Sequence, residues 1–144
     1  MRLPATVRPP SAAVAAVRML AAAVWIAFGL LFKVMGLVPR HRAIVAAVLG
    51  EGLAGPVTLA VGLGETALGL WILSGIRPRT CVAVQAAAIA SMNGLELALA
   101  VDLLLAPLPM VVGNALFLGA GWWAASQAPR AFTPRSAAPS GGPA

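Results

Sequence analysis

Glu65 and Glu96 are the residues of this sequence whose type and position most strongly indicate chemistry, because each interrupts a long apolar segment. An ionisable group at the centre of a bilayer costs about 2.5–3.5 kcal/mol on insertion scales, so it needs a charged partner, a proton or a function. With a rise of about 1.5 Å per residue, both carboxylates lie at a similar depth, roughly 13 Å below the outer surface. A polar pocket at this depth would let a carboxylate exchange protons with a quinone or bind a small polar ligand.

Three further polar side chains belong to the same predicted site. Asn93 lies three residues before Glu96 and shares its helix face, whereas Asn114 and Lys33 lie nearer the outer surface on other segments. Lys33 has two alternatives: it turns inward to pair with a carboxylate, or its long stem snorkels to the headgroups. The predicted polar core or ligand site therefore consists of Glu65, Glu96, Asn93, Lys33 and Asn114.

Small residues surround Glu65 in its segment. Gly62, Glu65 and Gly69 fall on one face at helical spacing, and such a face suits close packing against a neighbouring helix in lipid. Glu65 should therefore point inward. The alternative to a ligand site is a polar staple, in which these side chains only hold the helices in register and each hydrogen bond contributes about 0.6–2 kcal/mol.

A second polar group is predicted at the membrane surface. Arg40, His41 and Arg42 begin a short segment of helical spacing, and Asp102 lies near the same surface. Cations at the start of a helix oppose its dipole, so these residues should interact with something outside the helix: lipid phosphates, Asp102 or an acidic partner protein. Contact with lipid headgroups is the simplest of these, and His41 alone is weak evidence for catalysis.

The elements that position these residues follow from composition and hydropathy. Of the 144 residues, 60% are hydrophobic and only 10% are charged, too few to cover the surface of an ordinary soluble domain. We predict an all-α fold, a bundle of four transmembrane helices with a short amphipathic interfacial helix between the first and the second. The predicted spans are about 19–38, 56–75, 80–105 and 108–125, in a membrane domain over 17–126 that follows a flexible lead-in (1–16) and precedes a disordered tail (127–144).

Basic residues indicate the orientation of the chain. The net charge is +6, but every Lys or Arg except Lys33 lies outside or at the edge of an apolar segment, so these residues are topology signals and do not indicate nucleic acid. With the amino terminus inside, Arg40 and Arg42 lie outside and the other arginines inside. We predict a multi-pass protein of the cell membrane with both termini in the cytoplasm.

The sequence has few ligands for a cofactor. His41 is its single histidine, which excludes a haem held by two histidines, and Cys81 alone supports neither a dithiol relay nor an iron–sulfur cluster. We therefore predict no metal and no cofactor held covalently or by protein ligands. A quinone is the cofactor that the polar pocket would suit, and electron transfer would need a carrier from a partner.

The polar residues form a pattern that resembles the DoxX-like family of small four-helix membrane proteins, over residues 17–125. The pattern comprises Trp25, Gly29 and Lys33 before Val38-Pro39-Arg40, then Gly62-Leu63-Gly64-Glu65 with Gly69, then Asn93-Gly94-Leu95-Glu96 and Asp102. The resemblance implies kinship with a membrane subunit of a thiosulfate:quinone oxidoreductase and with relatives in thiol and oxidative-stress complexes. Some relatives carry a nucleotide-binding reductase domain, but here Gly62-Leu63-Gly64 lies inside a membrane span, which argues against independent catalysis.

Three functions fit these features. The preferred one is a membrane subunit or anchor of a quinone-linked redox complex, at most a non-catalytic or quinone-docking subunit of an oxidoreductase with a soluble redox partner. The second is a small proton-coupled transporter or permease-like protein, which with four spans would act as a homo-oligomer. The third is a purely structural assembly factor, for which the polar staple suffices.

Overall fold

The computed structural model describes residues 10–128, and these residues form helices and no strand. In chain order the elements are α1 (Ala12–Ile26), the π-helix η1 (Ala27–Val34), α2 (Arg40–Leu49), α3 (Glu51–Ser74), α4 (Pro78–Leu99), the 3₁₀ turn η2 (Val101–Leu103) and α5 (Pro107–Ser126). The predicted all-α bundle of four long helices, with a short helix between the first and the second, is confirmed. Most of the predicted lead-in and the predicted disordered tail fall on residues 1–9 and 129–144, outside the described part.

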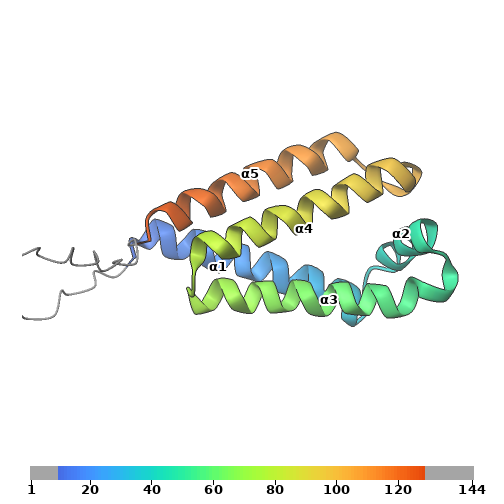
Figure 1. Ribbon diagram of the computed structural model, residues 1–144, viewed down its shortest axis with the longest axis horizontal. Helices are drawn as coiled ribbons and strands as arrows, with labels where there is room; N and C mark the ends of the chain where they lie inside the picture. The colour runs from blue at the N-terminus through green and yellow to red at the C-terminus, as the bar shows by residue number, and fades with distance from the viewer. Residues whose placement is uncertain (1–9, 129–144) are drawn as a thin grey trace, which may run out of the picture.

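The four long helices form two hairpins (Figure 1). The first hairpin consists of α1 with its continuation η1 packed along α3, and the second consists of α4 packed along α5. The hairpins meet through α1 and α5 at the end where both described termini lie, and they diverge toward the other end. There α2 contacts both α3 and α4, so it bridges the two hairpins.

Glycines allow the first hairpin to pack closely. A Cβ on Gly62 would lie 2.8 Å from the carbonyl oxygen of Gly29, and a Cβ on Gly29 would lie 2.5 Å from the carbonyl oxygen of Gly62. A Cβ on Gly69 would likewise lie 2.6 Å from Ile26. The groove of small residues predicted beside Glu65 is therefore confirmed, and α1 and its continuation η1 occupy it.

The first span begins earlier than predicted. Helix α1 starts at Ala12, where the Ser11 hydroxyl accepts a hydrogen bond of 3.3 Å from the Val14 amide, and the helix continues as η1 to Val34. The prediction of 19–38 took Arg18 as the boundary. Instead, Arg18 lies inside the helix and its guanidinium donates to the carbonyl oxygens of Ile72 and Leu73, at 2.9 and 3.2 Å, where α3 ends. A basic side chain satisfies those last carbonyls, which have no partner within their own helix.

Two other boundaries also differ from the prediction. Helix α3 starts at Glu51 and includes Pro56, because the break after α2 is at Gly50, whose φ of 87° favours glycine. Helix α4 ends at Leu99 and not near 105. The residues that follow form η2 and an extended link to Pro107, and within this link Leu104 and Leu105 line a cavity. These two leucines therefore line the cavity and do not belong to a membrane-spanning helix.

The outer surface of the bundle is apolar. Each of the four helical stretches is long and apolar enough to cross a bilayer. Large side chains on them face outward, such as Leu20 at 67%, Leu70 at 58% and Leu116 at 71% exposed. An exposed apolar surface of this extent is expected where lipid is the solvent.

Candidate functional site

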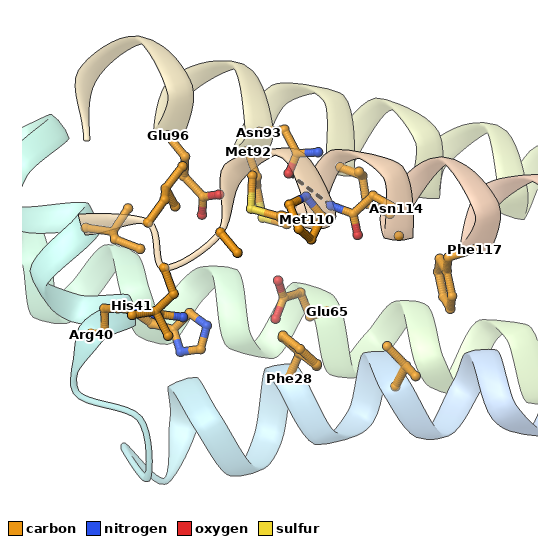
Figure 2. A pocket seen from close by; sticks show the side chains of 18 of the residues that line it. Phe28, Arg40, His41, Glu65, Met92, Asn93, Glu96, Met110, Asn114 and Phe117 are labelled. Carbon is orange, nitrogen blue, oxygen red and sulfur yellow. Dashed lines mark hydrogen bonds between the residues drawn. The ribbon is translucent and has the colours of Figure 1, made fainter. Parts of the chain in front are cut away.

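A cavity of about 610 Å³ lies between the two hairpins at the end where they diverge. Figure 2 shows side chains from both hairpins and from α2 around this space. Its walls are mostly apolar and aromatic, with Phe28, Met92, Met110 and Phe117 among them. The five residues predicted as a polar core or ligand site all line it: Glu65, Glu96, Asn93, Lys33 and Asn114.

Lys33 pairs with Glu65. Its Nζ lies 2.8 Å from each oxygen of the Glu65 carboxylate. Only 9% of the Lys33 side chain and 5% of the Glu65 side chain are exposed, so the pair is shielded on nearly all sides. Of the two alternatives left open by the sequence, the structure shows the inward one, and Lys33 does not snorkel.

The π-helix η1 determines where Lys33 points. Backbone bonds from residue i to i+5 add about one residue to each turn compared with an α-helix, and such segments often mark functional sites. Met35 donates to the carbonyl oxygen of Leu30 in this pattern, at 2.9 Å. Lys33 is near the end of the segment, where it faces α3. Hydrophobic periodicity alone does not predict this change of helix type.

The second hairpin contributes an amide pair and a carboxylate. Asn114 on α5 donates a hydrogen bond of 3.1 Å to Asn93 on α4 (Figure 2). One turn further along α4, Glu96 also faces the cavity. The ion pairs within residues 10–128 are Lys33–Glu65 and Arg42–Glu51, so Glu96 belongs to neither. Glu96 is thus a carboxylate in the cavity wall that has not been matched to a cation.

The floor of the cavity joins the hairpins. The indole of Trp25 on α1 donates a hydrogen bond of 2.9 Å to the Gln85 side chain on α4, and the bond is buried. The Trp25 ring also lies near Phe117 on α5, with centroids 6.4 Å apart. Neither Trp25 nor Gln85 is among the predicted site residues, although the spacing of Gln85 places it on the same helix face as Asn93 and Glu96.

Helix α2 brings Arg40 and His41 to the mouth of the cavity, where both line it. The His41 ring stacks on Phe32 at 6.1 Å between centroids and meets Phe28 edge to face at 6.2 Å. Burial, with the positive charges of Lys33 and Arg40, lowers the pKa of His41 from 6.5 to about 4 against the opposing effect of the Val38 backbone, so the ring is neutral at pH 7. His41 Nδ1 and Arg40 Nε are buried and have no hydrogen-bond partner among the described residues.

The other two residues predicted at the interface lie elsewhere. Arg42 is exposed and pairs with Glu51 at 3.3 Å, a partner within the chain that the sequence did not suggest. Asp102 is exposed on η2 and does not line the cavity. The predicted interfacial group is therefore divided, with Arg40 and His41 at the cavity and Arg42 and Asp102 away from it.

Comparison with known proteins agrees with the architecture. The sequence model of the DoxX-like family matches residues 22–122, more than two thirds of the 144-residue chain. No curated protein and no solved structure matches it. The matched range covers the second and third apolar helices, most of the first and the last, and every residue of the cavity wall, which supports an integral membrane protein that crosses the bilayer several times.

Proposed function

We propose that this chain, which belongs to the DoxX-like family, is the quinone-docking membrane subunit of a redox complex. The observation that carries the proposal is the cavity of about 610 Å³ in the wall of which Glu65 and Glu96 lie. Small-molecule sites typically enclose about 300–1,000 Å³ and combine apolar walls with a few polar groups, as this cavity does.

A quinone matches the chemistry of this wall. Its ring is flat and uncharged, its carbonyl oxygens accept hydrogen bonds, and its tail is apolar and resides in lipid. Phe28 and Phe117 offer aromatic surface for the ring, and the amides of Asn93 and Asn114 offer polar contacts. Glu96 supplies a carboxylate that is not committed to a cation and could exchange a proton with a bound quinol.

The proposal includes a partner that carries electrons. The sequence contains one histidine and one cysteine, too few for a bis-histidine haem or a cysteine-bound cluster. A soluble redox protein would therefore dock at one end of the bundle. We place the end with Arg18, Arg77 and Arg79 in the cytoplasm by the positive-inside rule, together with both termini.

Quinone binding can be measured in nanodiscs through tryptophan fluorescence. Trp25 lines the cavity, whereas Trp71, Trp122 and Trp123 do not, so a bound quinone should quench Trp25 first. Saturable quenching by a short-chain quinone that is lost in Trp25→Phe is the expected result. Quenching that rises linearly and is equal in both proteins would show partition into lipid only and would refute the proposal.

A matched pair of glycine variants tests whether the cavity is the site. Gly113 lines the cavity and a Cβ there meets no atom within 4 Å, so we expect the side chain of Gly113→Leu to occupy cavity space. Gly119 lies on the same helix with equally open surroundings but outside the cavity. We expect Gly113→Leu to abolish saturable quenching and Gly119→Leu to preserve it. Solute flux into liposomes by the chain alone, lost in Glu65→Gln, would favour the transporter instead.

A further inference from the structure

The wall of the cavity between the hairpins is not equally covered on all sides. The lining residues from α3 and α4, such as Glu65 and Ile89, are buried or half-buried. Five lining residues are exposed, and they come from η1 or from the start of α5 and the link before it: Phe28, Leu105, Ala106, Pro109 and Gly113. The exposed part of the wall is therefore the side formed by η1 and α5.

The contacts between helices also indicate an opening on that side. Helix α2 contacts α4 and η2, and α3 contacts α4, so these elements close the opposite side of the cavity. Helix α5 packs against α4 and α1, whereas η1 packs against α1, α2 and α3. The hairpins diverge toward this end of the bundle (Figure 1). The boundary between η1 and α5 is thus the side of the cavity that no extensive helix contact closes within residues 10–128.

An aromatic contact forms the lower edge of this opening. The rings of Trp25 on α1 and Phe117 on α5 lie at the cavity floor with centroids 6.4 Å apart. The two helices run in opposite directions, so one turn nearer to α2 the corresponding residues are Phe28 on η1 and Gly113 on α5. Glycine has no side chain, and a Cβ on Gly113 would meet no atom within 4 Å. The space beside Phe28 is therefore not filled from α5.

The opening lies at the depth of the lipid tails. Both flanking stretches, Ala12–Val34 and Pro107–Ser126, are long and apolar enough to cross a bilayer. Gly113 follows the first residue of α5 by six positions, which places it about 9 Å inside the helix, where half of the hydrocarbon core is about 15 Å thick. The five exposed side chains contain no polar atom. An apolar chain suits such an opening, whereas a hydrated solute would lose its hydrogen bonds to water there.

We propose that the cavity takes its ligand directly from the lipid through the opening between η1 and α5, and that the tail of a bound quinone lies between Phe28 and Gly113. The ring is then inside, among the polar groups of the cavity. This inference rests on the proposed function and adds the route of entry and the class of ligand, a ring on a long apolar chain. The cavity of about 610 Å³ encloses only the ring, so the length of the tail is not restricted.

Tail length tests whether the cavity is open to lipid. Two naphthoquinones with the same ring, one with a short and one with a long isoprenoid tail, are bound to the protein in nanodiscs. Each Kd is expressed as a mole fraction of quinone in the lipid. We expect the two values to agree within about threefold, because an apolar tail gains little free energy on moving from lipid to an apolar protein surface. A closed cavity would instead exclude the long tail, and loss of its binding would overturn the inference.

A photoreactive tail tests where the opening lies. A naphthoquinone with a diazirine in the tail, close to the ring, is bound and irradiated, and the labelled residues are identified by mass spectrometry. We expect labels on η1 and on residues 105–113, and an excess of unlabelled quinone should remove them. Gly113→Leu should reduce this labelling to background, whereas Gly119→Leu, on the same helix but outside the cavity, should retain it. Displaceable labels on α2 or α3 in place of η1 and α5 would overturn the inference.

Failure of this inference can be distinguished from failure of the proposed function. Saturable quenching of Trp25 by the short-tailed quinone, with no binding of the long-tailed one, would refute the lateral opening and leave the proposed function intact. Labelling of the same residues by a diazirine phospholipid that the quinone does not displace would assign the opening to a lipid chain and refute the tail site. Absence of saturable binding of either quinone to the parent chain would refute the proposed function and this inference with it.

Discussion

Removing one partner of the Lys33–Glu65 pair should be the most destabilising single change of a polar residue in the cavity. Glu65→Gln leaves the Lys33 ammonium in a site where only 9% of its side chain is exposed, and Lys33→Met leaves the Glu65 carboxylate where only 5% is exposed. Breaking a buried pair in this way costs about 3–5 kcal/mol in soluble proteins. A charge at the centre of a bilayer costs about 2.5–3.5 kcal/mol on insertion scales, which agrees. We expect each single variant to lose about 3 kcal/mol of unfolding free energy.

The double variant Lys33→Met/Glu65→Gln measures the interaction energy between the two side chains of the pair. It leaves neither charge unpaired, so its loss should be smaller than the sum of the two single losses by at least about 2 kcal/mol. Unfolding by SDS in mixed micelles, followed by circular dichroism, measures all four free energies of the cycle. Glu96 lines the same cavity, so Glu65→Gln is repeated in a Glu96→Gln background to detect a Lys33 that turns to Glu96 instead.

The exposed pair Arg42–Glu51 is the matched control for this cycle. Its side chains are 60% and 80% exposed, and surface pairs of this kind contribute about 0–1 kcal/mol. Arg42→Gln and Glu51→Gln should therefore have small, additive effects. If the losses for Lys33→Met and Glu65→Gln were also additive, or if Lys33→Met lost nothing, then Lys33 would extend to the headgroups in the bilayer and the argument from the ion pair would be refuted.

Three further predictions follow from the helix geometry and from His41. Deleting Leu31 should convert η1 to α-helix and rotate Lys33 by only about 30° relative to α1, because the lost residue and the tighter winding compensate each other. Lys33→Met should therefore still cost about 3 kcal/mol in the deletion background, as measured by the same SDS titration, and a loss near zero would contradict this account of η1. Gly62→Ala, whose Cβ would lie 2.8 Å from the Gly29 carbonyl oxygen, should cost about 1–3 kcal/mol, whereas Gly64→Ala, with no atom within 4 Å, should be neutral or stabilising; equal effects would contradict close packing of η1 on α3. His41 is the single histidine, so its imidazole NMR signals can be followed directly, and they should not titrate between pH 8 and 5.5. Because the pKa of His41 falls from 6.5 to about 4 on folding, the unfolding free energy should decline as the pH is lowered from 6.5 toward 4. His41→Phe should remove this pH dependence.

The sequence predicts the inward face of each long helix where its chemistry allows one solution. Gly62, Glu65 and Gly69 share one face of their helix. A carboxylate is costly against lipid, and glycines allow a neighbouring helix to pack closely, so both features indicate that this face points inward. Asn93 and Glu96 follow in the same way from their spacing of three. In the structure Glu65, Asn93 and Glu96 do line one cavity, and Gly62 and Gly69 pack against the first helical stretch.

What the sequence does not predict depends on short irregular segments. The direction of Lys33 is determined by η1, and the change from α- to π-helix leaves no mark in hydrophobic spacing. The position of Arg40 and His41 depends on the turn before α2 and on the break at Gly50, which together place α2 against α3 and α4. An amphipathic segment with a basic start is equally compatible with a surface helix, so only the tertiary contacts distinguish a cavity wall from a headgroup site.

The pattern of polar bonds argues for a ligand over a polar staple. Lys33 and Glu65 both belong to the first hairpin, and Asn93 and Asn114 both belong to the second, so neither bond holds the hairpins together. Within residues 10–128, Trp25–Gln85 is the one hydrogen bond between side chains that joins the two hairpins, and it lies at the floor of the cavity. A staple would place such bonds along the whole length and leave no space. This chain instead fixes one end and leaves about 610 Å³ between the hairpins at the other, with the carboxylate residue Glu96, which belongs to no ion pair within residues 10–128, in its wall. Since polar groups in lipid are retained where they have a partner, the missing partner is best supplied by a molecule that enters between the hairpins.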